Sequence, residues 1–472
     1  MRKRLMCVCT ALLVALTLMA EGKVKYVFYF IGDGMGVNQV NGTETYLAAL
    51  EGRIGTSPLC FASFPAAGLV TTFSGTNGVT DSAAGGTALA TGHKTKNGAL
   101  GLTTDLTAPT YSLAERAKAS GVASGVATSV SVDHATPGAF YAHVKDRNMY
   151  HQIGKDLITA GLDFYAGSDF VKPEDKELSG DKSLYVQFDE AGYTLARGYA
   201  DYRKKAGKAD KMILLQSEVA SKADRSCLPY AIDRKKSDLT LQDITRAGIN
   251  FLSKKNPEGF FLMIEGGKID WACHANDAGT VFREVIDMDN AVKVAYEFYA
   301  QHPDETLIVI TADHETGGIV LGTGRYEIHT DVLKYQKMSV GAFSQYIAGQ
   351  HQKQGAKFTW EFVKKQLQDN FGFWAQVDLS DKETEHLQQA YEKFCAGVAK
   401  DSKTLYESEN IIARTAKEII NRKAMIGWVS GGHSNGYVPV FAIGAGSEEF
   451  TGRIDNTDIP KKIAALAGYV EK

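Results

Sequence analysis

The sequence lacks several features that would assign it to a protein class at once. Its 52 Lys and Arg residues are balanced by 55 Asp and Glu, and the formal net charge is -3. The basic patch of a nucleic-acid-binding surface is therefore missing. The cysteines after residue 20 are widely spaced and form no C-x-x-C metal motif. No internal repeat or low-complexity tract occurs, and a hydrophobic content of 44% is ordinary for a globular protein.

Beyond the N-terminus, no apolar run is long enough to span a bilayer. The N-terminus itself is typical of a secretory signal, with basic residues 2–4, an apolar stretch over residues 5–19, and Ala20 before the predicted cleavage point. We therefore predict a signal peptide over residues 1–20. The mature chain would be exported, periplasmic or extracellular, and without a transmembrane segment. An uncleaved membrane anchor is the alternative.

Short apolar runs that end in glycine-rich or acidic loops predict buried strands. They occupy residues 24–31, 121–128, 260–264, 306–310 and 438–443, and helical patterns lie between them over residues 111–119, 239–253 and 276–300. This alternation predicts an α/β fold with a central, mostly parallel sheet and helices on both faces. Residues 21–472 would form one catalytic domain. Residues 330–423, which are polar and helical in pattern, would be a helical insertion in it.

Three acidic residues lie at or just past the carboxyl ends of predicted strands: Asp33, Glu265 and Asp313. In open α/β sheets ligands bind at the carboxyl ends of the strands, so we expect the active site there. Like charges that converge need either protonation or cations. This pattern therefore predicts a cation-binding site at the sheet edge.

Ser82 opens a run of small residues, from Asp81 to Gly92, that predicts a helix. A serine at a helix N-terminus lies where backbone N–H groups favour an anion. The same pattern also fits an ordinary helix cap. Ser82 therefore cannot be assigned a catalytic role from its own segment.

Imidazole and carboxylate groups, which suit zinc, recur in the remaining motifs. Asp270 and His274 are one helical turn apart, so both can face one ion. His314 follows a predicted strand, and His433 lies in a glycine-rich loop before another. Each residue alone fits a structural role, but together they indicate a metal centre.

The motifs, in this order, resemble those of the alkaline phosphatase family. They are residues 32–36, 81–83, 134–137, 143–147, 265–274 and 311–315, followed by His433. The resemblance implies an alkaline phosphatase that hydrolyses small-molecule phosphate monoesters to an alcohol and inorganic phosphate. It also allows a homodimer, which is common among members of the family.

The resemblance further implies two zinc ions and one magnesium ion. The first zinc site would consist of Asp270, His274 and His433; the second of Asp33, Asp313, His314 and Ser82. A third site would share Asp33 and add Thr136 and Glu265. Its oxygen ligands suit magnesium.

In the implied mechanism, Ser82 is the nucleophile and forms a phosphoserine that water then hydrolyses. A serine hydroxyl is a weak nucleophile at its free pKa, and a neighbouring cation would favour the alkoxide. Arg147 would grip the phosphate, because its planar fork matches two phosphoryl oxygens in a way that lysine cannot copy.

Two positions vary within the family, and we expect both side chains to lie around the metal ligands. His134 stands where members carry Asp or His, which leaves the third metal open. Trp271 stands where other members carry Lys or His, so phosphate would be held less tightly.

Two alternatives to this function exist. One is a phosphodiesterase or sulfatase of the same superfamily; residues 227–231 approach a sulfatase motif but lack its arginine. The other is a phosphate- or metal-binding protein that has lost catalysis.

Overall fold

The computed structural model describes residues 24–174, 182–324, 326–398 and 400–472. The predicted signal peptide lies outside these ranges. Among the described residues, no helix has the length and apolarity needed to cross a membrane.

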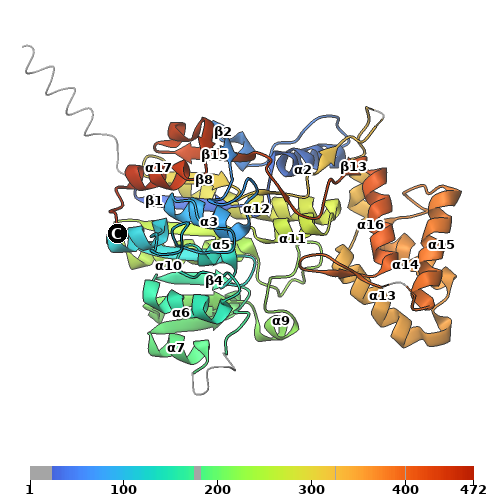
Figure 1. Ribbon diagram of the computed structural model, residues 1–472, viewed down its shortest axis with the longest axis horizontal. Coiled ribbons are helices and arrows are strands. Elements are labelled where there is room, and N and C mark those ends of the chain that lie inside the picture. Colours follow the sequence, from blue (N-terminus) through green and yellow to red (C-terminus); the bar gives the residue numbers. More distant parts are fainter. Residues whose placement is uncertain (1–23, 175–181, 325, 399) are drawn as a thin grey trace, which may run out of the picture.

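A ten-stranded sheet forms the centre of the described chain (Figure 1). In spatial order its strands are β16 (Gly452–Asp455), β2 (Ala66–Thr71), β15 (Val438–Gly444), β8 (Thr306–Thr311), β1 (Tyr26–Ile31), β7 (Phe260–Glu265), β3 (Ala123–Thr128), β4 (Phe164–Gly167), β6 (Lys211–Leu215) and β5 (Tyr193–Arg197). Within this sheet only β15 runs antiparallel to its neighbours. The prediction of a mostly parallel sheet is confirmed.

Helices cover both faces of the sheet. On β3, Gly125 faces Leu252 of α10 (Leu241–Lys255), whereas the Ser124 hydroxyl donates to the Ala114 carbonyl of α4 (Leu113–Ala119). Adjacent strand residues point to opposite faces, so α10 and α4 lie on opposite sides. The other helices of this body are α2 (Val37–Leu50), α3 (Ser82–Thr91), α5 (Ala135–Gly138), α6 (Tyr150–Ala160), α7 (Leu184–Glu190), α8 (Tyr199–Lys205), α9 (Glu218–Ala223), α11 (Lys268–His274), α12 (Ala278–Tyr299) and α17 (Asp458–Ala467).

The central strands are apolar because both of their faces are buried. All six residues of β7 and of β8 are buried, which explains why each reads as a continuous hydrophobic run. Polar side chains begin where these strands stop, and the site is built there.

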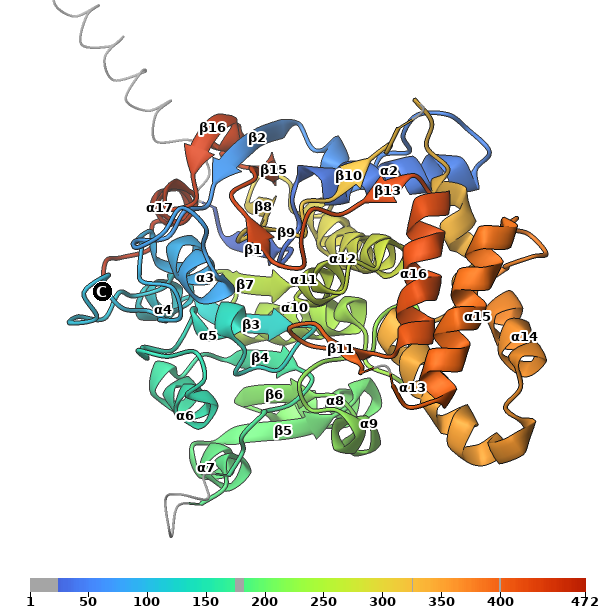
Figure 2. The same ribbon diagram turned by 45° about the vertical axis from the view of Figure 1, so that its right-hand side comes forward.

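Four helices form a helical lobe beside the sheet: α13 (Val340–Gln354), α14 (Trp360–Phe371), α15 (Asp381–Cys395) and α16 (Ile411–Lys423) (Figure 2). Both α13 and α16 contact the body: the Val340 N–H donates to Asp277 Oδ2 at 2.8 Å, and the Lys417 ammonium donates to the Ala275 carbonyl at 2.7 Å. A hairpin of β11 (Ser402–Lys403) and β12 (Ser408–Glu409) extends from the lobe toward the strand ends in both views. The sequence did not indicate this hairpin.

Candidate active site

The three acidic residues at the strand ends lie together. Strand β1 runs between β7 and β8, with Ile31 paired to Glu265 on one side and to Thr311 on the other. Asp33 and Asp313 each follow two residues after their strand, and all three carboxylates are fully buried. The parallel register of three strands therefore gathers the acidic side chains at one edge.

Buried carboxylates this close together resist ionisation. Burial, reinforced by the negative charge of Asp313 and other neighbours, raises the pKa of Asp33 well above its usual range. The pKa of Asp313 is raised in the same way, and burial raises the pKa of Glu265 to about 7. Bound cations would remove this penalty by compensating the negative charge.

Ser82 lies at the first residue of α3 and is almost fully buried. The preceding Asp81 caps the helix, because its side chain accepts from the Ala84 N–H at 3.0 Å. The helix packs closely on the site: a Cβ on Gly85 would lie 2.9 Å from the Asp313 carbonyl oxygen. Glycine is required there by this approach, which brings the Ser82 hydroxyl to the carboxylates.

One group of ligand atoms surrounds His314. Its Nε2 lies 3.2 Å from the Ser82 hydroxyl and 3.3 Å from both Asp33 Oδ1 and Asp313 Oδ2. Burial lowers the pKa of His314 well below its usual range, so the ring is neutral. Its Nδ1 faces the Thr316 hydroxyl at 3.1 Å. With the proton on Nδ1, Nε2 offers a lone pair to the centre of the group.

A second group joins α11 to the loop before β15. His274 Nε2 lies 3.3 Å from Asp270 Oδ2 and 3.2 Å from His433 Nε2. The Nδ1 atoms of the two histidines face the carbonyls of Gly431 at 2.6 Å and Thr80 at 2.9 Å. With each Nδ1 directed at a carbonyl, the two Nε2 atoms face each other, an arrangement that a shared cation would make favourable.

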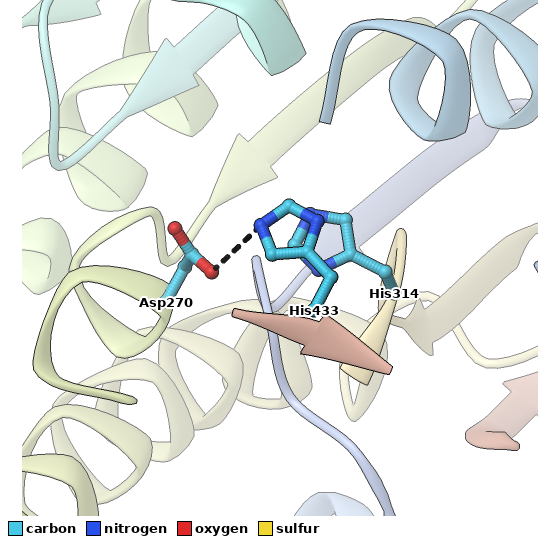
Figure 3. A group of neighbouring side chains, drawn as sticks. All are labelled: Asp270, His314 and His433. Atoms are coloured by element: carbon cyan, nitrogen blue, oxygen red, sulfur yellow. Dashed lines mark ion pairs between the residues drawn. The ribbon is translucent and has the colours of Figure 1, made fainter. Parts of the chain in front are cut away.

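The two groups adjoin each other. Figure 3 shows the His433 ring against the His314 ring, with Asp270 facing His433, and the two ring centroids are 3.6 Å apart. Asp270, His314 and His433 also form a geometric set in which ligand atoms lie within 4.8 Å of one another. The predicted ligands of both zinc sites thus converge, with His314 between them.

A third group lies on the other side of Asp33. Ligand atoms of Asp33, His134 and Glu265 are within 4.8 Å of one another. The Thr136 hydroxyl is 3.5 Å from Asp33 Oδ2, and the Thr128 hydroxyl donates to Glu265 Oε2. His134 was expected around the ligands, but its position puts it within the group.

Arg147 reaches the same site from the loop before α6. Its guanidinium donates to Asp81 Oδ2 at 3.3 Å, and its Nη2 lies 3.3 Å from His134 Nε2. Burial and Arg147 lower the pKa of His134 to about 3, so this ring is neutral beside the cation. Arg147 therefore stands between the cap of α3 and the third group.

Sequence reasoning missed Thr316. Its hydroxyl donates to Asp270 Oδ1 at 2.6 Å and faces His314 Nδ1, so it connects a ligand from each of the first two groups. Thr316 stands two residues after His314, but a threonine has no ligand character that would have singled it out.

The residues fit metal ions. Four buried polar atoms of the site have no hydrogen-bond partner among the described residues: Asp33 Oδ1, Glu265 Oε1, Asp270 Oδ2 and His134 Nδ1. Orphaned carboxylate oxygens are costly unless a cation or water binds them. Three of the four belong to residues predicted as metal ligands.

Known proteins match this chain over most of its length. A family model described as "Alkaline phosphatase" matches residues 24–166 and 172–469. The chain belongs to the alkaline phosphatase family. Alkaline phosphatase 3 of Bacillus subtilis (strain 168) is 32% identical over 454 residues, which cover 95% of this chain and 90% of the relative.

Solved alkaline phosphatases have the same fold. The cold-active enzyme of a psychrophilic Shewanella species is 29% identical with a TM-score of 0.76, covering 94% of this chain and 99% of that one. The Thermus thermophilus enzyme is 27% identical with a TM-score of 0.77, covering 96% and 93%. This chain is therefore an alkaline phosphatase, an enzyme of a metal-dependent family that hydrolyses phosphate monoesters.

Proposed function

We propose that this alkaline phosphatase works through a phosphoserine at Ser82. The observation that carries the proposal is the position of the Ser82 hydroxyl, buried at the N-terminus of α3 and 3.2 Å from His314 Nε2. A serine that only capped the helix would point back to the backbone, and in this helix Asp81 already caps.

The three groups of ligands would hold two zinc ions and one magnesium ion. Asp270, His274 and His433 would hold the first zinc; Asp33, Asp313, His314 and Ser82 the second; and Asp33, Thr136 and Glu265 the magnesium. When bound, these ions would neutralise the phosphate and lower the pKa of the nucleophile and of water. A variant of the alkaline phosphatase from the Antarctic bacterium TAB5 has magnesium bound in a site called M3. This supports a third metal site in the family.

The chain's own residues orient the substrate. Arg147 would bind two phosphoryl oxygens through its fork, and Asp81 holds one of its nitrogens in place. The dipole and free N–H groups of α3 favour the phosphate's negative charge next to Ser82. These contacts suit a terminal phosphoryl group with several free oxygens, so we propose a preference for monoesters over diesters.

Three further proposals rest on the sequence and the family. Residues 1–20 would direct export to the periplasm or beyond. Residues 330–423 would be an insertion in a single catalytic domain, residues 21–472. The enzyme would form a homodimer.

A Ser82→Ala variant tests the mechanism. It should fold, retain zinc and lose at least about a thousandfold in turnover, because the covalent step is removed. Ser124→Ala, at another buried serine on the far side of β3 from α10, is the matched control and should keep its activity. Acid quenching of the wild-type enzyme with labelled substrate should place the label on Ser82.

Near-normal turnover of Ser82→Ala, with no phosphoserine trapped in the wild type, would overturn the covalent mechanism. Rates on a monoester and its methyl diester, measured in the same preparations, check the proposed preference. Equal rates would contradict the role given to Arg147.

A further inference from the structure

A pair of stacked aromatic side chains lies beside the metal-ligand groups: Trp271 from the body and Tyr406 from the helical lobe. Tyr406, between β11 and β12, stacks on Trp271 of α11, with ring centroids 4.1 Å apart and planes inclined by 6°. A near-parallel stack this close fixes the tyrosine ring against the body. The lobe thus contributes the Tyr406 side chain to the site through the β11–β12 hairpin, which extends from the lobe toward the body (Figure 2).

Tyr406 faces residues of two ligand groups. Its ring meets the His274 ring edge to face at 5.5 Å and lies 6.3 Å from the His134 ring. Arg147 is close enough to interact electrostatically with the tyrosine hydroxyl. The ring therefore lies next to the place where phosphate would meet Arg147.

The hairpin that carries Tyr406 is held in position. The Thr404 N–H donates to the Glu407 carbonyl at 2.9 Å, which closes the turn around Tyr406. At its base, Glu409 forms a buried ion pair with Lys417 at 2.7 Å. This anchoring means that ordering Tyr406 costs little entropy when substrate binds.

The Tyr406 hydroxyl makes no hydrogen bond with any residue in the described part of the chain, while its ring is well packed. A partly enclosed hydroxyl without a protein partner, beside a phosphate-binding arginine, is available to a ligand. We propose that Tyr406 is a substrate-positioning residue whose hydroxyl donates a hydrogen bond to a phosphoryl oxygen that Arg147 does not bind. This rests on the proposed function, since it takes phosphate to bind at Arg147.

Tyr406→Phe is the decisive variant because it keeps the stack on Trp271 and removes only the hydroxyl. In the metal-loaded enzyme we expect the Kd of inorganic phosphate, measured by equilibrium dialysis, to rise about tenfold, as for a lost hydrogen bond to a charged group. The KM for a monoester should rise in parallel, with a much smaller change in kcat. Leu405→Ala, at the exposed neighbouring position of the same hairpin, should leave both unchanged.

A phosphate Kd within twofold of the wild type in Tyr406→Phe would overturn the proposal. So would a loss of affinity seen only in Tyr406→Ala, because the ring alone would then matter. Binding measured in Ser82→Ala separates the two proposals: Tyr406→Phe can weaken phosphate binding there whether or not Ser82 is the nucleophile.

Discussion

The strand-end cluster and the β11–β12 hairpin meet at one site, but different kinds of structure position them. The cluster lies at the ends of β1, β7 and β8. The parallel pairing of these buried strands holds Asp33, Glu265 and Asp313 close together. The hairpin is two short strands on a helical lobe, and it contributes one ring that stacks on Trp271.

This difference suggests that the strand-end cluster carries out the reaction and that the hairpin adjusts substrate affinity. Side chains on the sheet edge are the proposed metal ligands and their hydrogen-bond partners, so a change there should remove function. The hairpin touches the site through an aromatic contact and one free hydroxyl, so a change there should alter affinity and leave the reaction intact. Substitutions in the two regions should therefore differ in the size of their effects, which we expect to be largest at Asp33.

Asp33→Asn should give the largest loss. Asp33 belongs to two of the three groups of ligand atoms, so replacing its carboxylate should weaken metal binding in both groups. Turnover should fall on the order of a thousandfold. Metal content of the purified variant, measured by mass spectrometry, should fall with the rate. Asp163→Asn is the matched control: it changes a buried aspartate just before β4, at the amino end of the strand, where no site is expected.

If Asp163→Asn lost as much activity as Asp33→Asn at equal folded content, the position at the carboxyl end of the strands would not explain the effect.

Thr316→Val should cost less. It removes the hydrogen bond to Asp270 and the partner of His314 Nδ1, and loss of a group that orients metal ligands lowers affinity or activity about 10–100-fold. Thr316→Ser retains the hydroxyl and should recover most of the loss. Zinc affinity, titrated with a competing chelator, should follow the same order; equal affinity in all three proteins would rule out a positioning role.

Trp271→Lys should change phosphate binding by a smaller factor. A lysine could place a cation near phosphate, so we expect about fivefold stronger product inhibition than in the wild type. Trp271→Phe, which alters the stack on Tyr406 without adding charge, is the control. Inhibition constants for phosphate that are the same in the Lys and Phe variants would contradict the idea that the tryptophan weakens product binding.

His143→Gln should affect stability and leave catalysis unchanged. Although burial opposes it, hydrogen bonding to Glu115 raises the pKa of His143 above its usual range. The charged ring thus stabilises the fold below pH about 6.5, and this contribution is lost as pH rises through the raised pKa. Urea unfolding should show a cost of about 1–2 kcal/mol at pH 6 that shrinks at pH 9. A cost that does not change with pH would exclude the ion pair.

Much of the sheet and its ligands could be predicted because the signals are local. The apolar runs that became β1, β7 and β8 end in acidic residues, and Asp270 and His274 stand one turn apart on α11. The short strands β4, β5 and β6 were missed, since four or five residues carry too little periodicity.

Tyr406 and Thr316 could not be predicted for a different reason. Their importance arises from contacts with residues distant in sequence or from a shared hydroxyl, and neither residue type signals a ligand. Tyr406 reaches Trp271 across more than a hundred residues of chain, through a hairpin with strands of two residues each. Only the packed structure brings such residues to the site.

The central claim is that the strand-end residues form metal sites around Ser82. Crystals of the enzyme prepared with zinc and magnesium, with anomalous diffraction measured at the zinc edge, test it most directly. We predict two zinc peaks, one among Asp270, His274 and His433 and one among Asp33, Asp313, His314 and Ser82, with a lighter ion beside Glu265. A fully active enzyme whose zinc lies elsewhere, with these side chains bound only to water, would contradict the account.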